Sequence, residues 1–110
     1  MESSISEMRY VFTDEAKADL IQIRRFTLKN WGQNQSVHYL QELQQTLSRL
    51  TIMPQMGICR EQDLSNGIYS FPYASHTIYY TLLNERLIVM AVLHQSMVPD
   101  SHLENRKVKN

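Results

Sequence analysis

The chain has 110 residues, with eleven Lys and Arg against eleven Asp and Glu, and its only cysteine is Cys59. A chain of this length forms one domain and can bury a core without covalent cross-links. The balanced charge provides no overall positive field to attract nucleic acid, which disfavours non-specific RNA binding. A single cysteine excludes an internal disulfide and any metal site built from several thiolates.

The sequence carries no sign of a membrane or export segment. No apolar run approaches the roughly 20 residues that a membrane-spanning helix needs. Residues 1–7 lack the basic and apolar regions of a signal peptide. We therefore expect a cytoplasmic protein without a membrane partner. Residues 1–8 are expected to form a flexible extension, which leaves both Met1 and Met8 as candidate native starts.

A short β-rich run at 9–12 precedes the clearest helix of the chain. Thr13 is a favourable N-cap residue, and the acidic residues after it complement the helix dipole. Gly32 can end the helix, because a residue without Cβ adopts positive φ at low cost. Helical spacing predicts a buried face made of Ala16, Leu20, Ile23 and Thr27. It predicts an opposite side made of Lys17, Asp19, Arg24 and Lys29.

A second helix is expected after a loop at 32–35. Apolar residues recur there at steps of three and four, namely Val37, Leu40, Leu43, Leu47 and Leu50. This helix should pack on the first one and end before Pro54. Residues 54–66 contain Pro, Gly and charges, so they predict a connecting loop.

The hydrophobic period then changes to two, which indicates strands at 68–73, 77–83 and 87–93. The last strand is almost continuously apolar, as a central strand would be. Asn84 and Glu85 fit a tight hairpin turn. The predicted fold is therefore α+β: an N-terminal strand, a two-helix hairpin and a three-stranded antiparallel meander in one small sheet, followed by a short helical tail. We divide the chain into an extension at 1–8, a domain at 9–98 and a tail at 99–110.

Several short motifs occur together in this order. They are T-x-x-A-x-x-D-L-x-x-I from Thr13 with a W-G stop, Pro54-x-x-Gly57 before Arg60, G-I-Y-S-F-P-Y from Gly67, H-T-I-Y-Y from His76, and V-L-H-Q-S-M from Val92. Over residues 9–98 this combination resembles the ParE branch of the ParE/RelE superfamily of toxins. The resemblance implies a compact fold with a helical hairpin against a small antiparallel sheet.

The resemblance also implies a function in a type II toxin–antitoxin pair, with a cognate antitoxin encoded beside the toxin and a possible higher-order complex of the two. The ParE branch binds DNA gyrase and blocks it, whereas the RelE branch cuts messenger RNA on the ribosome. Fold alone does not choose between these activities. A third reading is a family member that only binds its antitoxin or regulates its operon.

Charge patterning separates the first two readings. Metal-free RNA cleavage needs a base, an acid and cations around the developing phosphorane charge. Residues 68–83 hold no Lys or Arg, so His94 with Arg60 is the only acid/base pair that a nuclease could use. His94 itself reads as a structural histidine on the face of Ile88, Met90 and Val92. We therefore favour gyrase binding without catalytic residues.

The remaining polar and aromatic residues suggest no cofactor. The four histidines lack the spacing of a metal site, so we expect no metal. His76 is expected to be either a solvent-facing residue or part of a hairpin, and His38 to lie at the surface. Aromatic residues recur in the predicted strands, where they suit core and cross-strand packing. They are Tyr69, Tyr73, Tyr79 and Tyr80.

Two binding surfaces are predicted from charge and position. The cations expected to contact the target, an acidic protein surface or DNA held by a topoisomerase, are Arg60 and the tail residues Arg106, Lys107 and Lys109. Antitoxin tails that fold on contact should fill the helical groove or an exposed sheet edge. The residues expected to contact such an acidic, amphipathic tail are Tyr10, Arg24, Arg25 and Phe26.

Overall fold

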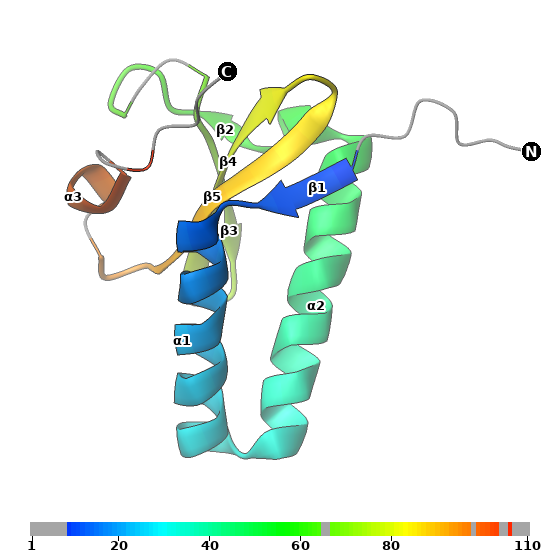
Figure 1. Cartoon of the computed structure of the whole chain (residues 1–110), viewed down its shortest axis with the longest axis vertical. Helices are drawn as coiled ribbons and strands as arrows, with labels where there is room; N and C mark the ends of the chain where they lie inside the picture. The colour runs from blue at the N-terminus through cyan, green and yellow to red at the C-terminus, as the bar shows by residue number, and fades with distance from the viewer. Residues whose placement is uncertain (1–8, 65–66, 98, 104–105, 107–110) are drawn as a thin grey trace, which may run out of the picture.

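The computed structural model describes residues 9–64, 67–97, 99–103 and 106 (Figure 1). The predicted extension at 1–8 lies outside these residues. The helices are α1 (Asp14–Trp31), α2 (Gln33–Ile52) and the short α3 (Pro99–Leu103), with a 3-10 turn, η1 (Pro54–Met56). The strands are β1 (Arg9–Phe12), β2 (Ile58–Cys59), β3 (Tyr69–Tyr73), β4 (His76–Leu83) and β5 (Arg86–His94).

All five strands form one sheet in the order β1-β5-β4-β3-β2. Strands β3, β4 and β5 make the predicted antiparallel meander, and β1 pairs in parallel with β5. The two-residue strand β2 was not predicted. It lies inside the expected loop and pairs with β3, with Ile58 opposite Ser70. A strand of two residues is too short to show a period, so only its pairing reveals it.

The helical hairpin begins as predicted but turns more tightly. The Thr13 hydroxyl accepts a hydrogen bond from the Ala16 amide at 3.1 Å and so caps α1. Gly32 alone, with φ of 92°, separates α1 from α2, so the predicted loop at 32–35 is wrong. The close approach of the helices is stabilised by a buried hydrogen bond of 2.7 Å between the hydroxyls of Thr27 and Ser36.

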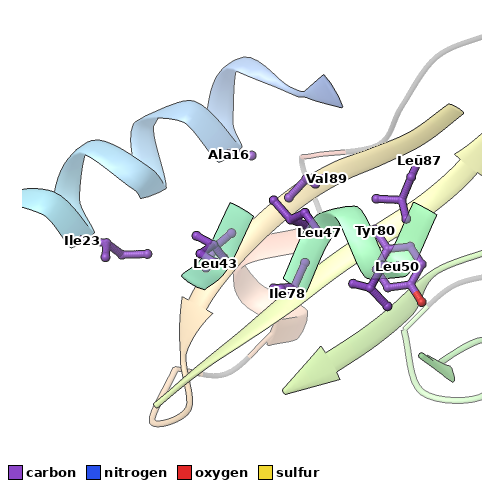
Figure 2. Packing of buried hydrophobic residues seen from close by; sticks show 10 residues of the cluster. Ala16, Ile23, Leu43, Leu47, Leu50, Ile78, Tyr80, Leu87 and Val89 are labelled. Atoms are coloured by element: carbon purple, nitrogen blue, oxygen red, sulfur yellow. The ribbon is translucent and has the colours of Figure 1, made fainter. Parts of the chain in front are cut away.

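The main core lies between the hairpin and one face of the sheet (Figure 2). Figure 2 shows α2 directing Leu43, Leu47 and Leu50 toward residues of β4 and β5. The buried residues of this cluster are Ala16, Ile23, Leu43, Leu47, Leu50, Ile78, Tyr80, Leu87, Val89 and Val92. Val37 was predicted to belong to it but is exposed, because the inward face of α2 at this level is formed by its neighbour Ser36, which meets Thr27 of α1.

A second, smaller apolar cluster covers the opposite face of the sheet. It consists of Ile68, Tyr79, Met90, Ala91, Leu93 and Leu103. Leu103 comes from α3, so the predicted helical tail packs against the face that the hairpin leaves free. Strand β5 contributes to both clusters, which explains its nearly continuous apolar sequence and confirms it as a central strand.

A β-bulge in β5 changes which side chains share a face. Tyr79 pairs with Ala91 and Tyr80 with Val89, which leaves Met90 as an extra residue without a partner on β4. Beyond such a bulge the alternation of faces is shifted by one residue. Val92 therefore faces the helices with Val89, while Met90 faces away. The predicted common face of Ile88, Met90, Val92 and His94 is wrong for this reason.

Within the described part of the chain, no helix is both long enough and apolar enough to cross a bilayer.

Candidate functional site

Two histidines meet where β4 begins and β5 ends. His76 lies directly opposite His94 in the strand register, and their rings meet edge to face with centroids 5.4 Å apart. The Tyr39 hydroxyl of α2 lies 2.6 Å from Nδ1 of His76. His76 is a hairpin residue, paired with Tyr73 at the turn between β3 and β4, as one of its two predictions stated. It is only 8% exposed, so the other prediction, that it faces solvent, is wrong. Burial, and then the neighbouring His94, lowers the pKa of His76.

His94 is held at the sheet end by the residues that follow it. Its Nδ1 accepts a hydrogen bond from the Ser96 amide at 3.1 Å and lies 2.8 Å from the Ser96 hydroxyl. A nitrogen that accepts from an amide carries no proton, so the neutral ring bears its proton on Nε2. His94 is thus hydrogen-bonded at the end of the sheet, as the sequence suggested.

Arg60 lies on the other face of the sheet. It forms an ion pair of 2.6 Å with Asp63 and donates a hydrogen bond to the Ser70 hydroxyl at 3.0 Å. Its guanidinium lies 5.8 Å from the centroid of the Tyr79 ring, and Tyr79 belongs to the cluster opposite the helices. His94 faces the helix side with His76. The structure therefore does not bring Arg60 and His94 together as an acid/base pair.

Arg106 is engaged inside the fold. Its guanidinium lies 2.7 Å from the Asp19 carboxylate of α1, and that carboxylate also accepts from the Val92 amide at 3.1 Å. Strand β1 pairs with β5 only as far as Val89, and Asp19 of α1 satisfies the Val92 amide beyond that point. Asp19 is thus not on the solvated side of α1, and Arg106 is not a free cation of the tail, both contrary to expectation. The predicted target-binding residues Lys107 and Lys109 lie outside the described residues.

An apolar groove of about 220 Å³ runs between the two long helices. Its lining comes from both helices and from the end of β1: Phe12, Leu20, Ile21, Arg24, Leu40, Leu43, Gln44 and Leu47. Tyr10 packs edge to face on Phe12 with ring centroids 5.7 Å apart. Phe12 lines the groove, so Tyr10 lies beside the groove on the edge strand β1.

The predicted antitoxin residues divide between two surfaces. Arg24 lines the groove. Phe26 lies two positions further on, about 200° around the helix, and packs on Trp31 with ring centroids 6.0 Å apart. Arg25 is exposed between these two residues. The sequence analysis did not identify Ile21, Leu40 and Gln44 as groove residues. Ile21 is an apolar residue beside the predicted buried face of α1, and Leu40 belongs to the apolar face predicted for α2, and this pattern could have indicated the groove.

Comparisons with known proteins agree on one family. The family of ParE toxins of type II toxin–antitoxin systems matches residues 10–99. The chain is 34% identical over 96 residues to toxin ParE1 of Mycobacterium tuberculosis, covering 86% of this chain and 97% of the relative. It is 34% identical over 94 residues to toxin ParE1 of Caulobacter vibrioides, covering 86% and 96%. It is 31% identical over 101 residues to toxin ParE of Escherichia coli, covering 88% and 94%.

Solved structures share the fold. The chromosomal ParDE system of P. aeruginosa aligns with a TM-score of 0.69 at 14% identity, covering 81% of this chain and 97% of that one. The toxin–antitoxin complex RelBE2 of Mycobacterium tuberculosis aligns with a TM-score of 0.58 at 16% identity, covering 80% and 98%. With the family matched over residues 10–99 and relatives above 30% identity over nearly their full length, this chain belongs to the ParE toxins of type II toxin–antitoxin systems.

Proposed function

We propose that this toxin acts by binding DNA gyrase and blocking it, and that a cognate antitoxin neutralises it. The observation that carries the proposal is the separation of Arg60 and His94 on opposite faces of the sheet. Cleavage of RNA would require a positioned acid and base with cations around the phosphorane. Strands β3 and β4 contain no Lys or Arg, which supports inhibition by binding over RNA cleavage.

The gyrase proposal is tested by adding the purified protein to a gyrase supercoiling reaction and, in parallel, to translating ribosomes. We expect loss of supercoiling with intact messenger RNA. His94→Gln serves as a control variant and should retain full inhibition, because a structural histidine takes no part in the effect. Transcripts cut in a manner that depends on His94 or Arg60, with normal supercoiling, would replace this proposal by the nuclease reading.

For the antitoxin, we propose that an amphipathic helix fills the groove between α1 and α2, with an acidic side chain facing Arg24. The apolar lining of the groove supports it as the binding site, and the solved structures with this fold, which are toxin–antitoxin systems, support an antitoxin as the partner. A disordered tail that folds into such a groove gains buried apolar area, and its acidic residue gains an ion pair. Tyr10 on the open edge of β1 extends the same surface.

The groove is tested with the variant Arg24→Glu. We expect its affinity for the antitoxin, measured by calorimetry, to fall about tenfold or more, since a like charge replaces an attraction at the contact. Inhibition of supercoiling should remain. Arg86→Glu makes the same charge change at an exposed position outside the groove and should leave the affinity unaltered. Equal losses in the two variants would show that the groove is not the antitoxin site.

A further inference from the structure

The tip of the helical hairpin presents aromatic surface to solvent. Phe26 is 52% exposed and Trp31 is 46% exposed, and the two rings pack edge to face. Figure 1 shows that this end of α1 and α2 projects beyond the sheet. Large aromatic side chains, together with Arg, are enriched at the residues that dominate protein–protein binding energy.

Contacts with Tyr39 of α2 hold this aromatic surface in place. The Trp31 ring lies 5.6 Å from the Tyr39 ring, and Tyr39 is fixed by its hydroxyl contact with His76. The Tyr73 hydroxyl donates to the Tyr39 carbonyl, and the Tyr73 and Tyr39 rings also pack together at 5.0 Å. The helix end is therefore tied to the sheet through an aromatic chain. A surface ordered before binding loses little conformational entropy on association.

The charge around the tip has one sign. Between Asp19 and Glu42 the sequence contains no acidic residue but contains Arg24, Arg25 and Lys29. Arg25 and Lys29 are exposed, and with Phe26 they span about 100° of the helix circumference. The complementary partner is accordingly an acidic protein surface with an apolar pocket for an aromatic ring.

We infer that this tip surface, formed by Arg25, Phe26, Lys29 and Trp31, binds an acidic segment of the toxin's protein target. It is separate from the groove, because Arg24 and Phe26 point to different sides of α1. The inference rests on the proposed function in one respect only, that the toxin acts by binding a protein. It replaces the basic tail as the principal target contact, since Arg106 is already paired with Asp19.

The test uses the full-length chain with the variants Phe26→Ala, Trp31→Ala and Lys29→Glu. Growth arrest on induction, inhibition of supercoiling and antitoxin affinity are measured for each. We expect each variant to lose growth arrest and supercoiling inhibition by about tenfold or more, while antitoxin affinity stays within about twofold. Ile52→Ala, at a 77% exposed apolar residue on the opposite end of α2, should change none of these three quantities. Lys29 is exposed, so Lys29→Glu should leave the fold intact and tests the inference even if Trp31→Ala weakens the fold.

Three outcomes would overturn the inference. Full growth arrest by all three variants would show that the tip does not touch the target. Parallel loss of antitoxin affinity would assign the tip to the antitoxin instead. Loss of toxicity in Lys107→Ala with Lys109→Ala, but in no tip variant, would return the contact to the tail. Growth arrest without any effect on supercoiling would reject gyrase as the target, and the tip variants would still decide the inference through growth.

Discussion

Gly57 has no room for a side chain. A Cβ atom at this position would overlap the hydroxyl of Tyr80, which is fully buried and donates to the Pro54 carbonyl at 2.6 Å. We expect Gly57→Ala to lower the free energy of unfolding by about 1–3 kcal/mol, as overpacking of a core does. Urea denaturation measures the loss.

Tyr80→Phe provides the matched control for Gly57. It removes the oxygen that the new methyl group would meet but leaves the Pro54 carbonyl without its partner. The double variant should therefore lose less stability than the sum of the two single variants, because the two residues are in contact. Strict additivity would show that Gly57 is needed for another reason.

His76 should make the stability of the protein depend on pH. Burial lowers the pKa of His76 below the ordinary value of 6.5, and the neighbouring His94 lowers it further, whereas Asp19 raises it. The other polar group that contacts the ring is the Tyr39 hydroxyl. The folded state then binds fewer protons than the unfolded state, so stability present above pH 6.5 is lost as the pH falls. At pH 5.5, one pH unit lower, the loss from one group is at most about 1.4 kcal/mol.

The measurement compares urea denaturation at pH 7.5 and 5.5. His76→Asn should show a smaller fall in unfolding free energy over this range than the wild type. His38→Asn, at an exposed histidine of α2, should behave like the wild type. A wild-type stability equal at both pH values would contradict the role assigned to His76.

The turn between β4 and β5 contains a residue that is not optimal for its backbone conformation. Asn84 and Glu85 both have positive φ, 52° and 60°, as a two-residue hairpin turn of this kind requires. Glycine adopts such angles without the steric cost that glutamate bears. We expect Glu85→Gly to stabilise the protein by about 0.5–1 kcal/mol. Thermal denaturation tests this, and a lower midpoint would argue against it. Ala74→Gly, in the turn before β4 with φ of 52°, should act in the same direction.

The bulge in β5 shows why strand faces were harder to predict than strands. Sequence period identified β3, β4 and β5 to within one residue at each end. The extra residue at Met90 is defined only by the pairing of β4 with β5, through Tyr79 and Tyr80. Nothing in the apolar run at 87–93 marks it, because every side chain there suits a core on either face.

At the scale of the whole molecule, the ion pair of Asp19 with Arg106 fastens the C-terminal segment to α1. Both side chains are largely buried, at 14% and 16% exposed, and the pair also contacts β5 through the Val92 amide. A double-mutant cycle with Asp19→Asn and Arg106→Gln should give a coupling energy of about 1–2 kcal/mol, above that of surface pairs.

The pair of Arg60 with Asp63 is the internal comparison for this cycle. It joins residues three apart, and Asp63 lies in solvent. Its coupling, measured with Arg60→Gln and Asp63→Asn, should stay below about 0.5 kcal/mol. Equal coupling in the two cycles would mean that the tail is not fastened by Arg106.

The sequence by itself determined the two helices, the meander and the family. Caps, glycine stops and periods of 3.6 or 2 depend on residues within a few positions of one another, so they can be read locally. Only the tertiary structure decided that Asp19 and Arg106, 87 positions apart, are partners, that His76 is buried, and that Arg24 and Phe26 serve different surfaces. These features arise from strand register and from the packing of distant segments, which no local pattern encodes.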